Sequence, residues 1–180
     1  MIHKILNFAL FQAGWFVSVL TASHGRPFVA FATATAAVGL SLWWFSADRA
    51  GDLRLLLAVA LIGFCIDTVH LHLGVFSLVG SPRFPHLCPL WLAALWGLLG
   101  VILRGSLNWL AGRFWLAALL GAVAGPLSYL GGAKLGAASL PANRAFSVAA
   151  LAIAWAVVMP LFVWLAHGSR FLGRTSQEAR

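Results

Sequence analysis

The sequence is poor in charge, and acidic residues are the scarcest of all. Only 9% of its 180 residues are charged, and four Asp and Glu stand against twelve Lys and Arg. A soluble domain ordinarily carries about 25% charged residues, whereas 62% of this chain is hydrophobic. This scarcity excludes an ordinary soluble domain and indicates an integral membrane protein.

The chain also lacks the short motifs of soluble catalysis. It has no P-loop, no dinucleotide-binding glycine fingerprint, no HExxH and no CxxC. Its two cysteines, Cys65 and Cys88, fall in apolar runs, which favours packing residues over a disulfide framework. The basic residues stand singly between apolar runs, so the net charge of +8 does not indicate nucleic acid as a partner. The sequence does not identify a cofactor, which stays unknown.

Six apolar runs are present, and each is long enough to cross a hydrocarbon core of about 30 Å as a helix. They do not alternate as barrel strands do. The sequence predicts an all-α fold, a single bundle of six transmembrane helices within residues 1–167, followed by a short polar cytoplasmic tail at residues 168–180. The expected helices are Ile5–Ala22, Phe28–Phe45, Leu53–Leu78, Leu87–Leu103, Phe114–Leu130 and Phe146–Ala166.

The distribution of Lys and Arg predicts the orientation, because cytoplasmic loops retain positive charge. With the N-terminus inside, the cytoplasmic set has eight members against four outside. Both termini are therefore expected in the cytoplasm. The inside set is Lys4, Arg49, Arg54, Arg104, Arg113, Arg170, Arg174 and Arg180, and the outside set is Arg26, Arg83, Lys134 and Arg144.

The first run has an alternative interpretation as a secretory signal, with Lys4 as a minimal basic region. Gln12 interrupts the apolar run, and no A-x-A triplet follows it. We therefore expect an uncleaved transmembrane helix.

A polar interruption in the third run, GFCIDTVHLHLG at residues 63–74, carries the main functional signal. Asp67 lies fourteen residues after Leu53, or about 21 Å along a helix, which places it in the outer leaflet. It is the one acid in any predicted span. His70, three residues on, shares its helix face. Because an intramembrane charge is costly, Asp67 and His70 form either a proton-handling or ligand-binding pair or a helix-packing pair.

A metal site is a weaker interpretation of the same end of the bundle. His72 lies on another face from Asp67 and His70, so the His-x-His spelling does not chelate from a helix. His24, His86 and Cys88 are expected at the same outer end and are weak candidates for further ligands. We do not predict a metal.

The fifth run contains a second anomaly, Gly125 followed by Pro126. Proline removes a backbone donor, so we expect a helix break there unless neighbours compensate. Tyr129 then lies at the depth of Asp67. Gln12 and Trp96 are polar or large groups at mid-bilayer depth and are further candidates for a polar pocket.

Several motifs together resemble one family. They are Asn7 with Phe11-Gln12 and Gly14-Trp15-Phe16, the lone Asp67, Trp91 leading to Leu95-Trp96, and Gly125-Pro126-Leu127 with Tyr129 and Leu135-Gly136-Ala137. In order and spacing they resemble the bacterial inner-membrane family called domain of unknown function 2878. The resemblance implies an uncharacterised multi-pass protein of the inner membrane of Gram-negative bacteria, whose members are associated with genes for lipid modification and oxidative stress. It implies no activity.

Three functions therefore remain open. The bundle binds or carries a lipid or other hydrophobic small molecule at a polar pocket in its outer half, with Asp67 and Tyr129 as polar groups. Alternatively, it is a non-catalytic membrane subunit whose glycine-rich faces dock a partner protein. A small membrane-embedded lipid-modifying enzyme is the third possibility. The scarcity of titratable groups favours binding or transport.

Overall fold

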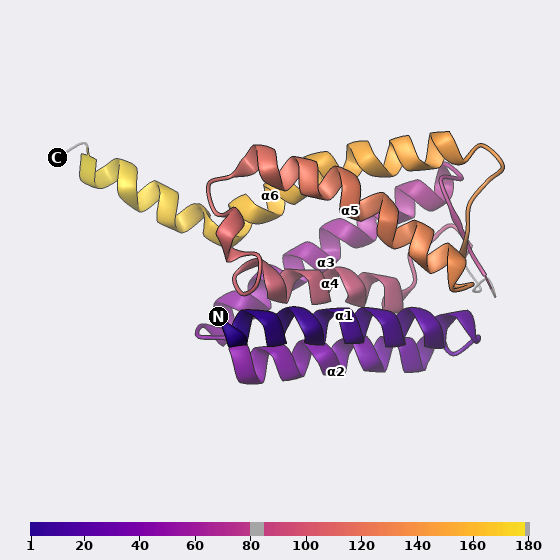
Figure 1. The fold of residues 1–180 in the computed structure, drawn as a ribbon, viewed down its shortest axis with the longest axis horizontal. Coiled ribbons are helices and arrows are strands. Elements are labelled where there is room, and N and C mark those ends of the chain that lie inside the picture. The colour runs from indigo at the N-terminus through magenta and orange to yellow at the C-terminus, as the bar shows by residue number, and fades with distance from the viewer. Residues whose placement is uncertain (80–84, 179–180) are drawn as a thin grey trace.

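Six α-helices account for most of the chain in the computed structural model, which describes residues 1–79 and 85–178, with the backbone alone for 169–178. Figure 1 shows the helices running side by side along the long axis, with the N-terminus and the end of the last helix at one end of the bundle. The elements are α1 (Ile2–Ser23), α2 (Pro27–Phe45), α3 (Arg49–His72), β1 (Ser77–Leu78), α4 (Leu90–Leu103), η1 (Asn108–Leu110), α5 (Phe114–Lys134), β2 (Ala138–Ser139) and α6 (Arg144–Glu178).

Five of the helices are long and apolar enough to cross a membrane. They are α1, α2, α3, α5 and the Arg144–Gly168 part of α6. The predicted all-helical fold is thus confirmed in its coarse form, since the strands β1 and β2 have only two residues each. The fourth predicted span appears as a shorter apolar helix, α4, of 14 residues.

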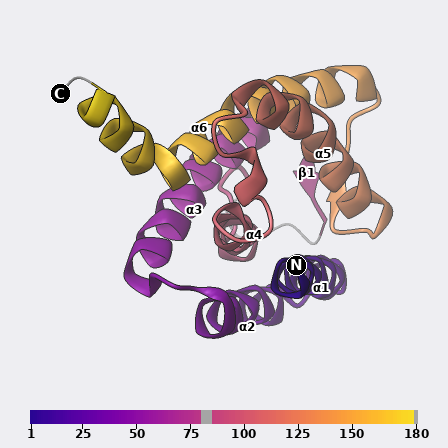
Figure 2. The same cartoon turned by 60° about the vertical axis from the view of Figure 1, so that its left-hand side comes forward.

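The central position of α4 explains why a short apolar helix is stable here. It packs against α1, α2, α3 and α6, and Figure 2 shows it in the middle of the bundle. Nine of its residues are buried. The helix begins at Leu90 rather than at the predicted Leu87 because Pro89, in an extended conformation, disfavours helical geometry at the residue before it.

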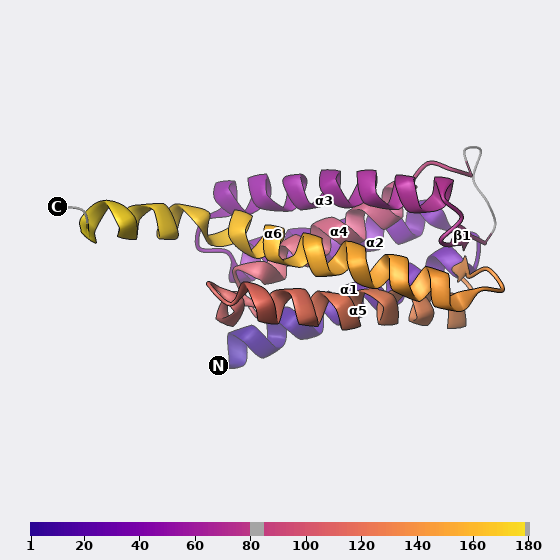
Figure 3. The same cartoon turned by 90° about the horizontal axis from the view of Figure 1, so that it is seen from above.

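The third predicted span was too long at its C-terminal end. The helix α3 ends at His72, where the sequence had predicted helix up to Leu78. Gly74 adopts a positive φ of 66°, and the Val75 N–H bonds back to the His70 carbonyl, which closes the helix. The chain then forms β1, which pairs antiparallel with β2 (Ser77 with Ser139, Leu78 with Ala138). Figure 3 shows β1 at the end of the bundle opposite the termini.

The predicted helix break at Gly125 and Pro126 was also wrong. The helix α5 is continuous from Phe114 to Lys134 with Pro126 inside it. Both residues are buried, and α5 packs closely along α6. Tertiary packing therefore holds a helix that local backbone preferences disfavour, as neighbouring helices often do in membranes.

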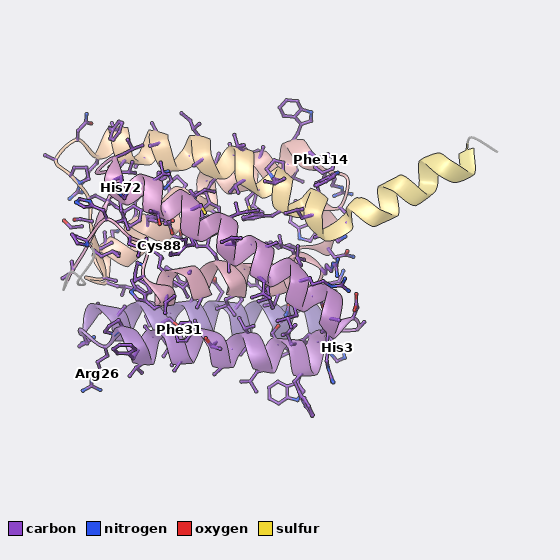
Figure 4. All side chains as sticks on the ribbon, turned by 180° about the vertical axis from the view of Figure 1, so that it is seen from behind. His3, Arg26, Phe31, His72, Cys88 and Phe114 are labelled. Carbon is purple, nitrogen blue, oxygen red and sulfur yellow. The ribbon has the colours of Figure 1, made fainter. Side chains whose placement is uncertain are left out.

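The outer surface of the bundle is apolar along the helices. Large exposed side chains include Leu57 on α3, Leu119 on α5 and Val157 on α6, each more than half exposed. Polar and charged residues gather at the ends, where Figure 4 labels His3 at one end and Arg26 and His72 at the other. Exposed Trp43, Trp44, Trp109 and Trp115 lie toward the end that holds the termini. This is the surface expected of a membrane protein with an interfacial aromatic belt.

Four of the basic residues that predict the orientation are not fully described by the structure. Arg83 and Arg180 are among the residues that the structure does not describe, and the side chains of Arg170 and Arg174 are not described either. Residues 168–178 of the predicted tail continue α6 as a helix, and residues 179–180 lie outside the described residues. The prediction of cytoplasmic termini stays a prediction.

Candidate functional site

Asp67 lies at the junction of three helices and is completely buried. The indole N–H of Trp96 on α4 donates to its Oδ2 at 2.7 Å. The hydroxyl of Tyr129 on α5 donates to its Oδ1 at 2.5 Å. Each carboxyl oxygen of Asp67 is therefore held by a neutral donor from a different helix, so this side chain joins α3 to both α4 and α5.

His70 lies beside Asp67 but makes no hydrogen bond to it. Its Nδ1 is 3.7 Å from Asp67 Oδ1, too far for a hydrogen bond. Within the described part of the chain, this buried nitrogen has no hydrogen-bond partner. The imidazole packs edge-on against Phe76 with ring centroids 6.4 Å apart. We call Asp67, His70, Trp96 and Tyr129 the Asp67 cluster.

Two glycines make room for the indole of Trp96 and for a second indole, that of Trp155, which packs against it. Trp96 stacks on Trp155 of α6, with centroids 4.5 Å apart and planes at 21°. A Cβ at Gly63 would lie 2.1 Å from the Trp96 ring, and one at Gly125 would lie 2.2 Å from Trp155 Cγ. Only a glycine admits the ring at these two positions. The indole pair is thus fixed by the backbones of α3 and α5.

A cavity of about 830 Å³ adjoins the cluster. It lies between α1, α4, α5 and α6, and most of its walls are aromatic or aliphatic, including Phe8, Phe11 and Trp15 of α1. Tyr129, Trp96 and Trp155 face it, whereas neither Asp67 nor His70 is a lining residue. Asp67 is therefore separated from the cavity by the tyrosine and tryptophan that bind it, and ligand contact at Asp67 stays a prediction.

Gln12 faces the same cavity from the α1 side. Its side chain is exposed, and it has no hydrogen-bond partner among the described residues. Of the sequence candidates, the structure therefore brings Asp67, His70, Trp96 and Tyr129 into one cluster. It places Gln12 on another wall of the adjoining cavity.

The cavity opens sideways between α1 and α5. Its lining includes Ile5, which is 59% exposed on α1, and Leu127, which is 60% exposed on α5. Residues that both line the cavity and reach the outer surface mark its mouth. Figure 2 shows α1 and α5 bordering the same side of the molecule. Because the mouth lies between helices of membrane length, hydrocarbon chains of the bilayer would face it.

The candidate metal ligands are not gathered into a site. The His24 ring bonds to the Leu20 carbonyl at the end of α1, while His86 packs against His72 with ring centroids 5.2 Å apart. Cys88 is buried between α3 and α4, and burial raises the pKa of its thiol, which disfavours the thiolate that binds metals. Among the described residues, no group of three or more His, Cys, Asp or Glu is arranged to hold a metal ion.

A second polar group occupies the end of the bundle near the termini, and sequence reasoning missed it. Arg104, at the end of α4, pairs with Asp52 at 3.1 Å and with Asp48 at 3.8 Å. Its Nε also donates to the Ala166 carbonyl of α6 at 2.9 Å. From the sequence, Arg104 served only to predict the orientation, because the sequence does not show which acid a loop arginine pairs with.

Asn7 is a buried residue that links three segments at the same end of the bundle by hydrogen bonds. It is 2% exposed, and its Nδ2 donates to Ser41 on α2 at 2.8 Å. Its Oδ1 accepts from the Ser106 hydroxyl at 2.7 Å. Asn7 thus fastens α1 to α2 and to the connection after α4. The sequence signal that could have revealed this role of Asn7 is a polar residue within an apolar run.

These features define a class of protein: an apolar helical bundle of membrane type with a laterally open internal cavity and a buried carboxyl group behind the cavity wall. The sequence model of the family described as "Protein of unknown function (DUF2878)" matches residues 4–161, so the chain belongs to this family. The resemblance drawn from the sequence motifs is thereby confirmed. No curated protein and no solved structure matches the chain.

Proposed function

We propose that the protein binds or carries a lipid or another hydrophobic small molecule in the cavity between α1, α4, α5 and α6. The observation that supports this proposal is the cavity's position and chemistry. Its volume, about 830 Å³, falls within the usual range for ligand pockets, about 300 to 1,000 Å³. Its walls are apolar, its mouth lies between lipid-facing helices, and a few polar atoms converge at Tyr129 and Trp96.

The proposal includes a topology. All six helices cross the bacterial inner membrane, α4 as a short span within the protein, and both termini lie in the cytoplasm. Asp67 is five residues from the end of α3, or about 8 Å along the helix, at the end away from the termini. The Asp67 cluster then lies in the outer half of the bundle, and a ligand enters sideways from the bilayer.

Binding or transport fits the cluster better than catalysis. Asp67 is shut off from the cavity by the residues that it holds. Among the described residues that line the cavity, Lys4 alone carries a charge, and it lies near the start of α1. General acid-base catalysis needs a titratable group within hydrogen-bond reach of the reacting atom. The cavity presents aromatic surface and neutral polar groups, which suit recognition.

A matched pair of glycine substitutions tests the proposal. Gly132 is buried in α5 and lines the cavity, and a Cβ there would meet no atom within 4 Å. Gly39 is exposed on α2, and a Cβ there is equally free. Gly132→Phe would fill cavity volume, while Gly39→Phe adds the same ring to the outer surface.

The measurement is the set of lipids that remains bound to the purified full chain, read by native mass spectrometry. We expect a bound hydrophobic molecule in the wild type and in Gly39→Phe, and its loss in Gly132→Phe. Equal occupancy in all three proteins, or none in the wild type after gentle extraction, would refute binding in this cavity.

A further inference from the structure

The cavity follows one face of α1 over most of the length of that helix. Lining residues on α1 recur at spacings of three and four, which places their side chains on one face. They include Lys4, Phe8, Phe11, Trp15 and Val19. The row from Lys4 to Val19 is about 22 Å long at a rise of about 1.5 Å per residue. One leaflet of the hydrocarbon core is about 15 Å deep, half of about 30 Å, so the row is long enough for a whole acyl chain.

The two ends of the cavity differ in charge. Lys4 lines the end that holds the N-terminus (Figure 1), and its side chain is exposed. Ser106, whose hydroxyl donates to the Lys4 carbonyl at 2.7 Å, lines the same end. Phe76 and Leu78 line the far end. Among the described lining residues Lys4 alone carries a charge, so the cavity has one cationic end and one apolar end.

The Lys4 ammonium has no ion-pair or hydrogen-bond partner within the part of the chain that the structure describes. Two acids at the same end of the bundle, Asp48 and Asp52, already pair with Arg104. Asp67 is fully buried toward the other end. The cation at the cavity end can therefore pair with an anion that comes from outside the chain.

The donors at the level of the Asp67 cluster are already used. The Tyr129 hydroxyl and the Trp96 indole N–H both donate to Asp67. Their protons are therefore not offered to a ligand, and no described lining residue at this depth is charged. An ionic headgroup is consequently matched at the cationic end of the cavity, and the rest of the cavity suits a hydrocarbon chain.

We propose that the cavity selects a long-chain amphiphile with a negatively charged headgroup, such as an alkyl phosphate. The headgroup pairs with the Lys4 ammonium, and the chain lies along Phe8, Phe11 and Trp15. This proposal rests on the proposed function and names the class of its ligand. Because an ion inside hydrocarbon is costly, the headgroup stays at the Lys4 end while the chain enters, which fixes the direction of the ligand.

The test compares hexadecyl phosphate, hexadecanol, hexadecylamine and inorganic phosphate. Each competes with radiolabelled hexadecyl phosphate for the purified full chain in phosphatidylcholine nanodiscs, with empty nanodiscs as background. We expect the wild type to bind hexadecyl phosphate about fivefold more tightly than hexadecanol, a factor that corresponds to about 1 kcal/mol, as for a favourable exposed ion pair. The preference should shrink in about 1 M salt, where the screening length is about 3 Å.

The other two probes check the sign of the charge and the need for the chain. Hexadecylamine should bind more weakly than hexadecanol, because its ammonium repels that of Lys4. Inorganic phosphate should not compete, because burial of the chain supplies most of the binding free energy.

Lys4→Gln is the decisive variant, because it removes the charge and keeps a polar side chain at an exposed position. It should bind hexadecanol as the wild type does and lose the preference for hexadecyl phosphate, whereas Lys4→Arg should keep that preference. Arg113→Gln is the matched control. It removes one positive charge just before α5 from an exposed residue that does not line the cavity, and it should keep the preference.

The outcomes separate the two proposals. If hexadecyl phosphate and hexadecanol bind the wild type equally and Gly132→Phe abolishes both, the cavity binds lipids but the selection of an anionic headgroup is refuted. Equal loss of the preference in Lys4→Gln and Arg113→Gln would assign it to general surface charge and refute the inference as well. Competition by inorganic phosphate as strong as that by hexadecyl phosphate would refute the amphiphile. If no alkyl probe binds the wild type, both this inference and the proposed function fail.

Discussion

The two ends of the bundle hold acids in opposite ways. Asp67 is fully buried, and its two oxygens accept from the neutral donors Trp96 and Tyr129. At the other end, the Asp52 side chain is 16% exposed and pairs with Arg104, which is 30% exposed. One carboxyl is held by directional bonds inside an apolar bundle, and the other by an ion pair that water reaches.

The contrast shows two ways in which this bundle holds an acidic side chain, one exposed to water and one not. An exposed ion pair is screened by water and salt, so it contributes about 0.2 to 1 kcal/mol at most. A buried polar group must be satisfied by protein, and each lost partner is costly. The Asp67 cluster is therefore the more fragile region, and it is the one that adjoins the cavity.

The largest expected effect is that of Asp67→Leu. It removes the acceptor of two buried donors, each of which costs about 1 to 3 kcal/mol when left unpaired. We expect the variant to lose at least about 2 kcal/mol of stability, measured as the free energy of unfolding in detergent titrations. Asp52→Leu is the matched control and should lose about 1 kcal/mol or less, because water reaches its former partners. Equal losses at the two sites would contradict the comparison.

Gly125→Ala should have the next largest effect. The added Cβ would lie 2.2 Å from Trp155 Cγ, so the indole must move or the helices must separate, at about 1 to 3 kcal/mol. Gly132→Ala on the same helix meets no atom within 4 Å and should be neutral or slightly stabilising, since alanine is the better helix former. Thermal melting of the two purified variants measures the difference. A Gly125→Ala protein as stable as Gly132→Ala would mean that the indole is not fixed by this glycine.

Sequence alone predicted the helices well, because uninterrupted apolar runs are a strong local signal. It failed where the local sequence pattern and the packing or backbone conformation of the folded chain favour different structures. Pro126 predicted a break, but packing against α6 keeps α5 continuous. The apolar residues up to Leu78 predicted helix, but the positive φ of Gly74 ends it.

The site was predicted only in part, for a similar reason. Asp67, His70 and Tyr129 stand out because polar residues are rare in apolar runs, and the depth count placed Tyr129 at the level of Asp67. The sequence predicted a polar pocket, but not the apolar walls of the cavity, because these come from residues of α1, α4, α5 and α6 that only the packing of the helices brings together. The position of Trp155 depends on its stacking against Trp96 and on the space left by Gly125 on another helix. The sequence of a single segment does not show these contacts.

The smallest expected effect is that of salt on the two acids. Asp52→Asn should cost less than about 1 kcal/mol at low ionic strength, and this difference should shrink in about 1 M salt, where the screening length is about 3 Å. The stability difference between the wild type and Asp67→Asn should not change with salt, because the site is shut off from water. Unfolding titrations at two salt concentrations measure both. Equal salt dependence at the two sites would show that water reaches the Asp67 cluster.

Photo-crosslinking is the most direct test of the central claim, that the cavity beside the Asp67 cluster holds a hydrophobic ligand. A long-chain alcohol with a diazirine near the middle of its chain is irradiated with the full-length protein in nanodiscs, and the labelled residues are mapped by peptide mass spectrometry. The account predicts labels on cavity residues such as Phe8, Phe11 and Leu127, and their loss in Gly132→Phe. Labels confined to the outer surface, at residues such as Leu57 and Leu119, and unchanged by Gly132→Phe would contradict it.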